Sequence, residues 1–200
     1  PRVRRQRQMC IRDREKVVEQ VTKEYPVVLV TGPRLVGKTT MLKKLMEGSS
    51  RGYVSLDDLN DRALAKNDPE LFLQLHKPPV LIDEVQYAPE LFTYIKVYAD
   101  THQEPGAFWL TGSQVFKLMR GVQESLAGRV AVLSMTSLSQ SELNGAETEP
   151  FRVDLDDLLK RERQSKSVDT KGIFERIYQG SMPAIAVSYT HLTLPTNPRV

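Results

Sequence analysis

Short apolar runs alternate along the chain with segments whose apolar residues recur every three or four positions. The runs have the length and β-branched composition of strands buried on both faces, and the periodic segments are typical of amphipathic helices. This alternation predicts a parallel sheet with right-handed crossovers. We expect strands at 27–31, 53–56, 80–84, 107–111 and 130–135, and helices at 15–25, 38–47, 61–66, 69–76, 91–99 and 172–178. A helix end with a glycine stop is expected at 124–129, His102 in the loop behind the helix at 91–99, and an amphipathic piece around Leu155, Leu158 and Leu159.

The first strand runs directly into a glycine-bounded loop. Residues 32–39 fit the pattern G-x-x-x-x-G-K-[ST], the phosphate-binding loop of nucleoside triphosphatases. Glycines let backbone N–H groups curl around phosphates, and the following helix directs its positive end at them. Lys38 is expected to reach the β- and γ-phosphates, and the Thr39 hydroxyl to ligate Mg²⁺. The predicted nucleotide-binding residues are Gly32, Pro33, Arg34, Leu35, Val36, Gly37, Lys38, Thr39 and Thr40.

A second candidate motif is the Asp83-Glu84 pair that ends an apolar strand about forty residues later. In open α/β folds, ligands bind at the carboxyl ends of the strands, so both carboxylates should face the phosphate loop. Asp83 is expected to hold Mg²⁺, directly or through water, and Glu84 to orient and deprotonate the attacking water. A solvated turn at the strand end is the alternative interpretation.

The strand at 107–111 is followed by Gly112-Ser113-Gln114. A small polar residue at its tip could contact the γ-phosphate or the attacking water. Ser113 is the first choice for this role and Thr111 the second, with an ordinary turn serine as the alternative.

The two ends of the chain resemble one piece of DNA translated in both directions. Residues 4–13 can be encoded by CGT CGG CAG CGT CAG ATG TGT ATA AGA GAC, and the reverse complement of that DNA encodes residues 187–196. The DNA also resembles a transposon-end adapter used for sequencing libraries. We therefore interpret 1–14 and 187–200 as non-native translation and exclude them from reasoning about the fold. Cys10, the one cysteine, and His191 then cease to be candidate functional residues.

Removing these ends reverses the apparent charge of the chain. The 200 residues have a formal charge of +3, but residues 1–14 contain six Arg and one Asp, and Arg199 adds one more positive charge. The remaining residues therefore carry a net charge of −3. An acidic chain without interleaved basic and aromatic residues gives no support for nucleic-acid binding. No run of eighteen apolar residues is present, so no membrane span is expected.

With these motifs in place, the chain resembles the AAA-type ATPases, and among them a prokaryotic group of ATP-binding proteins with a carboxyl-terminal domain of unknown function. Five motifs occur in order and support the resemblance, at 29–40, 56–58, 81–86, 110–114 and 125–129. A turn at 180–183 also fits. It implies a P-loop NTPase fold, an α/β/α sandwich of three layers with a mostly parallel central sheet of about five strands. The Asp-Glu strand would lie beside a central sensor strand.

The resemblance also implies roles for individual residues and regions. Ser113 occupies the sensor-one position, and Arg129 is a candidate arginine finger or relay acting on a neighbouring subunit of a homo-oligomer. For Arg129 the alternative is a helix-end arginine paired with a surface carboxylate. We expect an ATPase core at 15–143 and, at 144–186, a linker and the start of a truncated carboxyl-terminal region. A lid and an effector domain would lie beyond it.

The leading functional hypothesis is a cytoplasmic ATPase that uses ATP and Mg²⁺ and converts hydrolysis into a conformational change. A nucleotide-gated switch with little turnover is the alternative that the sequence leaves open. A small-molecule or nucleotide kinase is disfavoured, because no arginine cluster follows the fourth strand and the Asp-Glu pair suits activation of water. GTP is disfavoured because no Asn-Lys-x-Asp follows the second motif.

Overall fold

A computed structural model describes residues 14–143, 153–164 and 168–183 of the chain. The chain divides into two compact units, Arg12–Thr136 and a second unit that contains Ser137–Val200. The segments interpreted as non-native translation lie outside the described residues, except Arg14, which begins a helix. The division into a core at 15–143 and a following region at 144–186 stays a prediction.

The first unit is organised around a sheet of five strands in the order β2-β3-β4-β1-β5. All four pairings between neighbouring strands are parallel, which confirms the predicted parallel α/β sheet and its strand number. The Asp-Glu strand β3 lies beside β4, and β4 separates it from β1. The strands are β1 (Val27–Thr31), β2 (Gly52–Ser55), β3 (Val80–Asp83), β4 (Phe108–Gly112) and β5 (Val130–Ser134).

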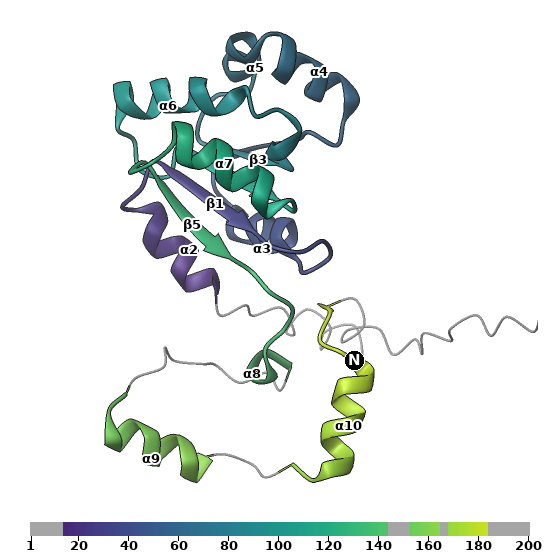
Figure 1. Cartoon of the computed structure of the whole chain (residues 1–200). Helices are drawn as coiled ribbons and strands as arrows, with labels where there is room; N and C mark the ends of the chain where they lie inside the picture. Colours follow the sequence, from purple (N-terminus) through teal and green to yellow (C-terminus); the bar gives the residue numbers. More distant parts are fainter. Residues whose placement is uncertain (1–13, 144–152, 165–167, 184–200) are drawn as a thin grey trace, which may run out of the picture. The chain divides into compact units, whose positions relative to one another are not determined.

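Helices cover both faces of this sheet and form the predicted three layers (Figure 1). One face carries α2 and α3, since Val18 of α2 and Met41 and Leu42 of α3 are buried. The other face packs against helices α4 to α7 in one continuous apolar cluster. The helices of this unit are α2 (Arg14–Thr22), α3 (Lys38–Leu45), α4 (Leu59–Asn67), α5 (Pro69–Leu75), the 3₁₀ turn η1 (Val85–Tyr87), α6 (Leu91–His102) and α7 (Val115–Ser125).

The three central strands are buried along their whole length, as their apolar composition predicts. Alternate residues point to opposite faces, so Leu29, Ile82 and Leu110 enter the apolar cluster with α4 to α7. Trp109 points to the other face, where its indole N–H donates to the Thr22 hydroxyl at 3.0 Å. Side chains on both faces of the sheet therefore pack against the helices that cover them.

Most predicted elements exist, and their ends differ by a few residues. Helix α6 extends to His102, which the sequence placed in the loop behind the helix; its ring stacks on Tyr98 at 4.0 Å between centroids and continues the last turn. Only the end of α7 was expected, because its start at Val115 has no capping side chain to mark it. The helix expected at 38–47 ends at Leu45, before the Gly48 turn.

The second unit contains three described helices, α8 (Gln140–Leu143), α9 (Leu155–Gln164) and α10 (Thr170–Gln179). Helix α9 corresponds to the amphipathic piece expected around Leu155, Leu158 and Leu159. The turn after α10 is tied to the start of this unit, since Leu138 N–H donates to the Ser181 carbonyl at 2.8 Å. Within the described part of the chain, no helix is both long and apolar enough to cross a membrane.

The phosphate loop requires glycine at its first position. Gly32 has φ +147°, and a Cβ atom there would lie 2.0 Å from the Met135 carbonyl oxygen. The backbone alone costs about 1–3 kcal/mol for a side-chain-bearing residue, and the collision adds to it. We expect Gly32→Ala to lower the free energy of unfolding by about 3 kcal/mol or more, measured by chemical denaturation.

Gly48→Ala is the matched control. Gly48 also has positive φ (+80°), but a Cβ there would meet no atom within 4 Å. Its substitution should cost only about 1–2 kcal/mol. Equal losses of unfolding free energy in the two variants would show that the close approach of the loop to Met135 is not what requires glycine at position 32.

Candidate functional site

The parallel register gathers the chemically active residues at one edge of the sheet. Thr31 pairs with Gly112 and Ser55 pairs with Asp83, so the carboxyl ends of β1 to β4 lie together. The phosphate loop follows β1, the Asp-Glu pair ends β3, and Ser113 follows β4. This edge is where doubly wound α/β folds bind ligands.

The loop between β1 and α3 has an open upper rim and a fixed base. Val36 is buried, whereas Leu35 is 78% exposed at a positive φ of 64°. Gly37, in the left-handed region, is the N-cap of α3 and supplies no side-chain cap for the helix. The first N–H groups of α3 therefore keep their capacity to bind an anion. Thr40, the last predicted nucleotide-binding residue, is exposed on the first turn of α3.

Lys38 lies at the start of α3 and is only 5% exposed. Its ammonium donates to the carbonyls of Gly32 and Pro33, at 2.9 and 2.8 Å. Burial lowers the pKa of Lys38, and the nearby Glu84 and Asp83 carboxylates partly counteract this shift. The ammonium is thus held inside the loop next to both carboxylates, which is the place from which it can reach bound phosphates.

The Asp83 carboxylate connects three parts of the edge. Its Oδ1 accepts hydrogen bonds from the Thr39 hydroxyl at 2.7 Å and from the Thr111 hydroxyl, and its Oδ2 accepts from the Tyr53 hydroxyl at 3.3 Å. Asp83 is 6% exposed and Thr111 is fully buried. The two predicted metal ligands, Thr39 and Asp83, are therefore in direct contact although 44 positions separate them.

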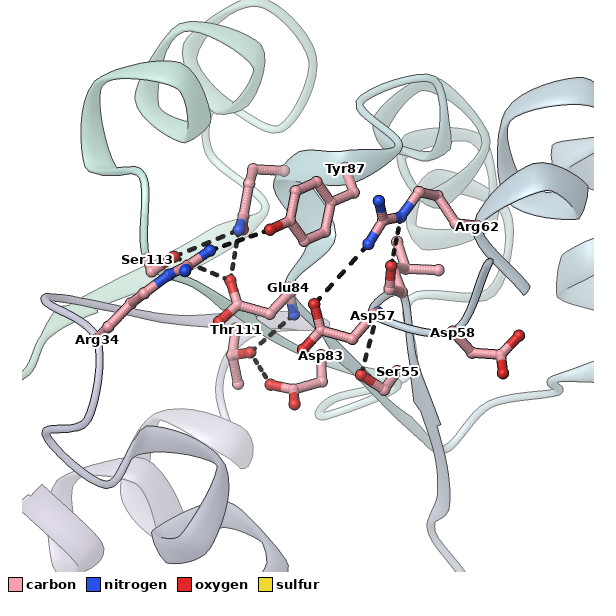
Figure 2. A network of polar contacts seen from close by, with 12 residues as sticks. Arg34, Ser55, Asp57, Asp58, Arg62, Asp83, Glu84, Tyr87, Thr111 and Ser113 are labelled. Atoms are coloured by element: carbon pink, nitrogen blue, oxygen red, sulfur yellow. Dashed lines mark hydrogen bonds and ion pairs between the residues drawn. The ribbon is translucent and has the colours of Figure 1, made fainter. Parts of the chain in front are cut away.

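Glu84 has a left-handed backbone conformation, with φ 58° and ψ 46°, and its N–H donates to the Thr111 hydroxyl at 3.1 Å. A residue other than glycine seldom adopts this conformation unless its surroundings enforce it. Its carboxylate Oε2 accepts from the Ser113 hydroxyl at 3.1 Å and from the Gln86 amide. Figure 2 shows Glu84 and Ser113 pointing toward each other beside Thr111 and Asp83.

Tyr87 joins the phosphate loop to α4. Its hydroxyl accepts a hydrogen bond from Arg34 at 3.1 Å, and the Arg62 guanidinium lies 4.0 Å from its ring centre (Figure 2). Arg62 also donates to the Leu56 carbonyl at 2.6 Å and lies 3.8 Å from Asp57. A cation–π contact and a hydrogen bond thus connect two arginines from separate elements through one tyrosine.

Arg129 lies away from these residues within its own chain. It precedes β5, at the amino end of the sheet, so the five-residue strands put about 16 Å between it and the carboxyl edge. Its guanidinium forms two hydrogen bonds with Asp100, which lower the pKa of Asp100 and raise that of Arg129. This contact matches the alternative interpretation of Arg129, a helix-end arginine paired with a surface carboxylate.

The donor set fits a magnesium nucleotide. Mg²⁺ prefers oxygen ligands and commonly takes one or two from the protein and the rest from phosphates and water. Thr39 and Asp83 supply such oxygens, and no group of three His, Cys, Asp or Glu side chains suited to a metal occurs among the described residues. The described residues also leave two buried side-chain oxygens without a partner, Thr31 Oγ1 and Gln86 Oε1, and both lie at this edge.

Sequence reasoning missed three residues of this site. Gln86 ends the motif at 81–86 but was assigned no role, Tyr87 was assigned none, and Tyr53 was expected only as part of a strand. No local pattern identifies them, because the left-handed Glu84 and the 3₁₀ turn η1 bring Gln86 back onto the Glu84 carboxylate. Tyr53 reaches Asp83 through the pairing of β2 with β3, which is a contact between distant parts of the chain.

Comparison with known proteins identifies relatives of unknown activity. Two uncharacterized proteins, from Mycobacterium tuberculosis and Mycobacterium bovis, are each 35% identical to the chain over 129 residues, which is 64% of the chain and 29% of either relative. The chain therefore spans less than a third of the length of these curated relatives.

Solved structures agree on the fold. A Walker-type ATPase of Pyrococcus abyssi is 16% identical with a TM-score of 0.56, over 88% of this chain and 64% of that one. A DNA replication initiation factor is 13% identical with a TM-score of 0.50, over 86% of this chain and 56% of that one. At these identities the likeness concerns the fold alone.

A family model described as an AAA domain matches residues 24–144, which is more than half of the chain and includes the phosphate loop, the Asp-Glu strand and Ser113. The five-stranded parallel α/β fold agrees with that match. The chain belongs to the AAA family of P-loop ATPases.

Proposed function

We propose that this domain binds ATP with Mg²⁺ at residues 32–40 and hydrolyses it, with Glu84 accepting a proton from the attacking water. The observation that carries the proposal is the Thr39–Asp83 hydrogen bond of 2.7 Å. It joins the end of the phosphate loop to the carboxylate pair, so that nucleotide, metal and general base can meet at one edge of the sheet.

The chemistry divides among the residues of this edge. Mg²⁺, when bound by Thr39 and Asp83, would neutralise charge on the phosphate oxygens. Lys38 would exchange the carbonyls of Gly32 and Pro33 for phosphate oxygens, and the N–H groups at the start of α3 would bind the same anion. Glu84 would orient a water and take its proton. Ser113, within 3.1 Å of Glu84, is close enough to contact that water or the γ-phosphate.

We infer that ATP hydrolysis in the cytoplasm changes the conformation of a part of the protein beyond the AAA domain. The curated relatives are more than three times as long as the matched region, which leaves room for such a part. A nucleotide-gated switch is the second candidate. It is favoured by the hydrogen bonds of the Lys38 ammonium to the carbonyls of Gly32 and Pro33, which occupy the group expected to bind phosphate. Single-turnover kinetics distinguish the two, because a switch releases products far more slowly than it performs the chemistry.

Lys38→Ala should abolish tight ATP binding. Removing the ammonium leaves phosphate charge unpaired in a buried loop, which should weaken ATP affinity by about thirtyfold or more. Titration calorimetry with ATP and Mg²⁺ measures the effect. Lys44→Ala is the control on the same helix, because Lys44 pairs with Glu15 at 2.8 Å and should leave affinity at the parental value. Parental affinity in Lys38→Ala would contradict the assignment.

Glu84→Gln should retain ATP binding and lose hydrolysis. A glutamine keeps the size of the side chain but cannot accept the proton, so turnover should fall by about 10²- to 10⁴-fold. Phosphate release under saturating ATP is the measurement, with Glu90→Gln, an exposed carboxylate six positions later, as the control. A Glu84→Gln protein that hydrolyses ATP at the parental rate would exclude Glu84 as the base.

We also propose that Arg129 acts on the nucleotide of a neighbouring copy in a homo-oligomer. Its distance from its own site and its position on the surface are compatible with this role, and its bonds to Asp100 would have to open. Arg129→Ala and Glu84→Gln proteins should each be inactive, and mixing them should restore part of the ATPase activity. Mixed assemblies that form and remain inactive would favour the surface ion pair.

A further inference from the structure

We propose that Gln86 is a positioning residue for the general base, holding one oxygen of the Glu84 carboxylate so that the other is presented to the attacking water. This inference rests on the proposed function, because it assigns a purpose to a contact of Glu84. It begins from the burial of Gln86, which is 3% exposed and whose side chain lies at the carboxyl edge of the sheet. A buried amide requires hydrogen-bond partners, and this amide finds them only on one side.

The contacts of Gln86 are directed at the candidate machinery. Its Nε2 donates to Glu84 Oε2 and lies 3.4 Å from Ser113 Oγ, and the Ser113 hydroxyl itself donates to the same Oε2. The side chains of Glu84, Gln86 and Ser113 therefore contact one another pairwise. The first two follow β3 and the third follows β4. Glu84 Oε2 thus has two donors, whereas the described residues give Glu84 Oε1 none.

This asymmetry determines which oxygen can act as a base. An oxygen that accepts two hydrogen bonds has few lone-pair directions left for a water, and its negative charge is stabilised. The other oxygen keeps its full accepting capacity. The Gln86–Ser113 pair therefore restricts rotation of the carboxylate and leaves Oε1 as the acceptor of the proton.

The oxygen of the Gln86 amide indicates that this arrangement lowers the stability of the fold. Gln86 Oε1 is buried and has no hydrogen-bond partner, and an unpaired buried acceptor is destabilising by about 1–3 kcal/mol. Turning the amide over would direct its oxygen at the Glu84 carboxylate, which repels it. Gly112 keeps the space open, since a Cβ there would lie 2.6 Å from Gln86 Oε1. A purely structural position would favour an apolar side chain over an amide held in this way.

The decisive variant is Gln86→Met, which keeps the length of the side chain and removes the donor and the unpaired acceptor. We expect its turnover to fall about tenfold to hundredfold, as for other misplaced catalytic groups, with ATP affinity near the parental value. Its midpoint of thermal unfolding should be no lower than that of the parent. The loss should fall on kcat while KM stays near the parental value, because the carboxylate is misoriented and the contacts to the nucleotide are intact.

A double-mutant cycle tests the shared acceptor. Ser113→Ala should also lower kcat, and the two losses should not be additive, because both donors bind one oxygen. Gln74→Met, an exposed glutamine on α5, should match the parent in every measurement. If Gln86→Met does not fold, Gln86→Asn replaces it, since it withdraws the amide by one methylene and should give the same kinetic loss.

The outcomes separate this inference from the function on which it rests. Parental kcat in Gln86→Met or Gln86→Asn, together with an inactive Glu84→Gln protein, would overturn the role of Gln86 alone. A Glu84→Gln protein with parental turnover would overturn the proposed function. Lower thermal stability with a parental kcat would show that Gln86 is only a packing residue and would also refute the inference.

Discussion

The arrangement of the site depends on the hydrogen bonds of one carboxylate. Asp83 accepts from Thr39 at the end of the phosphate loop, from Thr111 on β4 and from Tyr53 on β2, and thereby joins groups from four parts of the chain. A hydrogen bond to a charged group contributes about 1.5–3 kcal/mol, so these contacts hold α3 and three neighbouring strands in a fixed relation. The left-handed Glu84 follows immediately, and Thr111 stabilises it through the Glu84 N–H.

Residues at the end of β4 make several of the contacts that hold this edge together. This strand separates the phosphate-loop strand β1 from the acidic strand β3, and the space between them at the carboxyl edge is filled by its last residues. Thr111 binds Asp83 and the Glu84 backbone, Gly112 leaves room for Gln86, and Ser113 binds the Glu84 carboxylate. Three consecutive residues at this strand end therefore contact or make room for the proposed metal ligand, the proposed positioning residue and the candidate base.

Charge within this edge is balanced over short distances. The buried Lys38 ammonium lies near Asp83 and Glu84, and its pKa is lowered by burial more than the carboxylates raise it. A triphosphate would bring several negative charges to the same place, and Mg²⁺ would compensate part of them. Tyr87 connects Arg34 of the loop with Arg62 of α4, so a change at the loop rim has a direct physical connection to the helices that follow β2.

The sequence alone determined the parallel α/β class, the phosphate loop and the Asp-Glu pair, because local spacing and apolar periodicity encode them. Ser113 and Thr111 followed from their place at a strand tip, but their contacts did not: the fully buried Thr111 binds Asp83 and the Glu84 backbone, while Ser113 contacts the Glu84 side chain. Only the tertiary structure decided the contacts of Tyr53, Gln86 and Tyr87 and the pairing of Arg129 with Asp100. Strand register and one left-handed residue create those contacts, and neither property can be read from neighbouring residues.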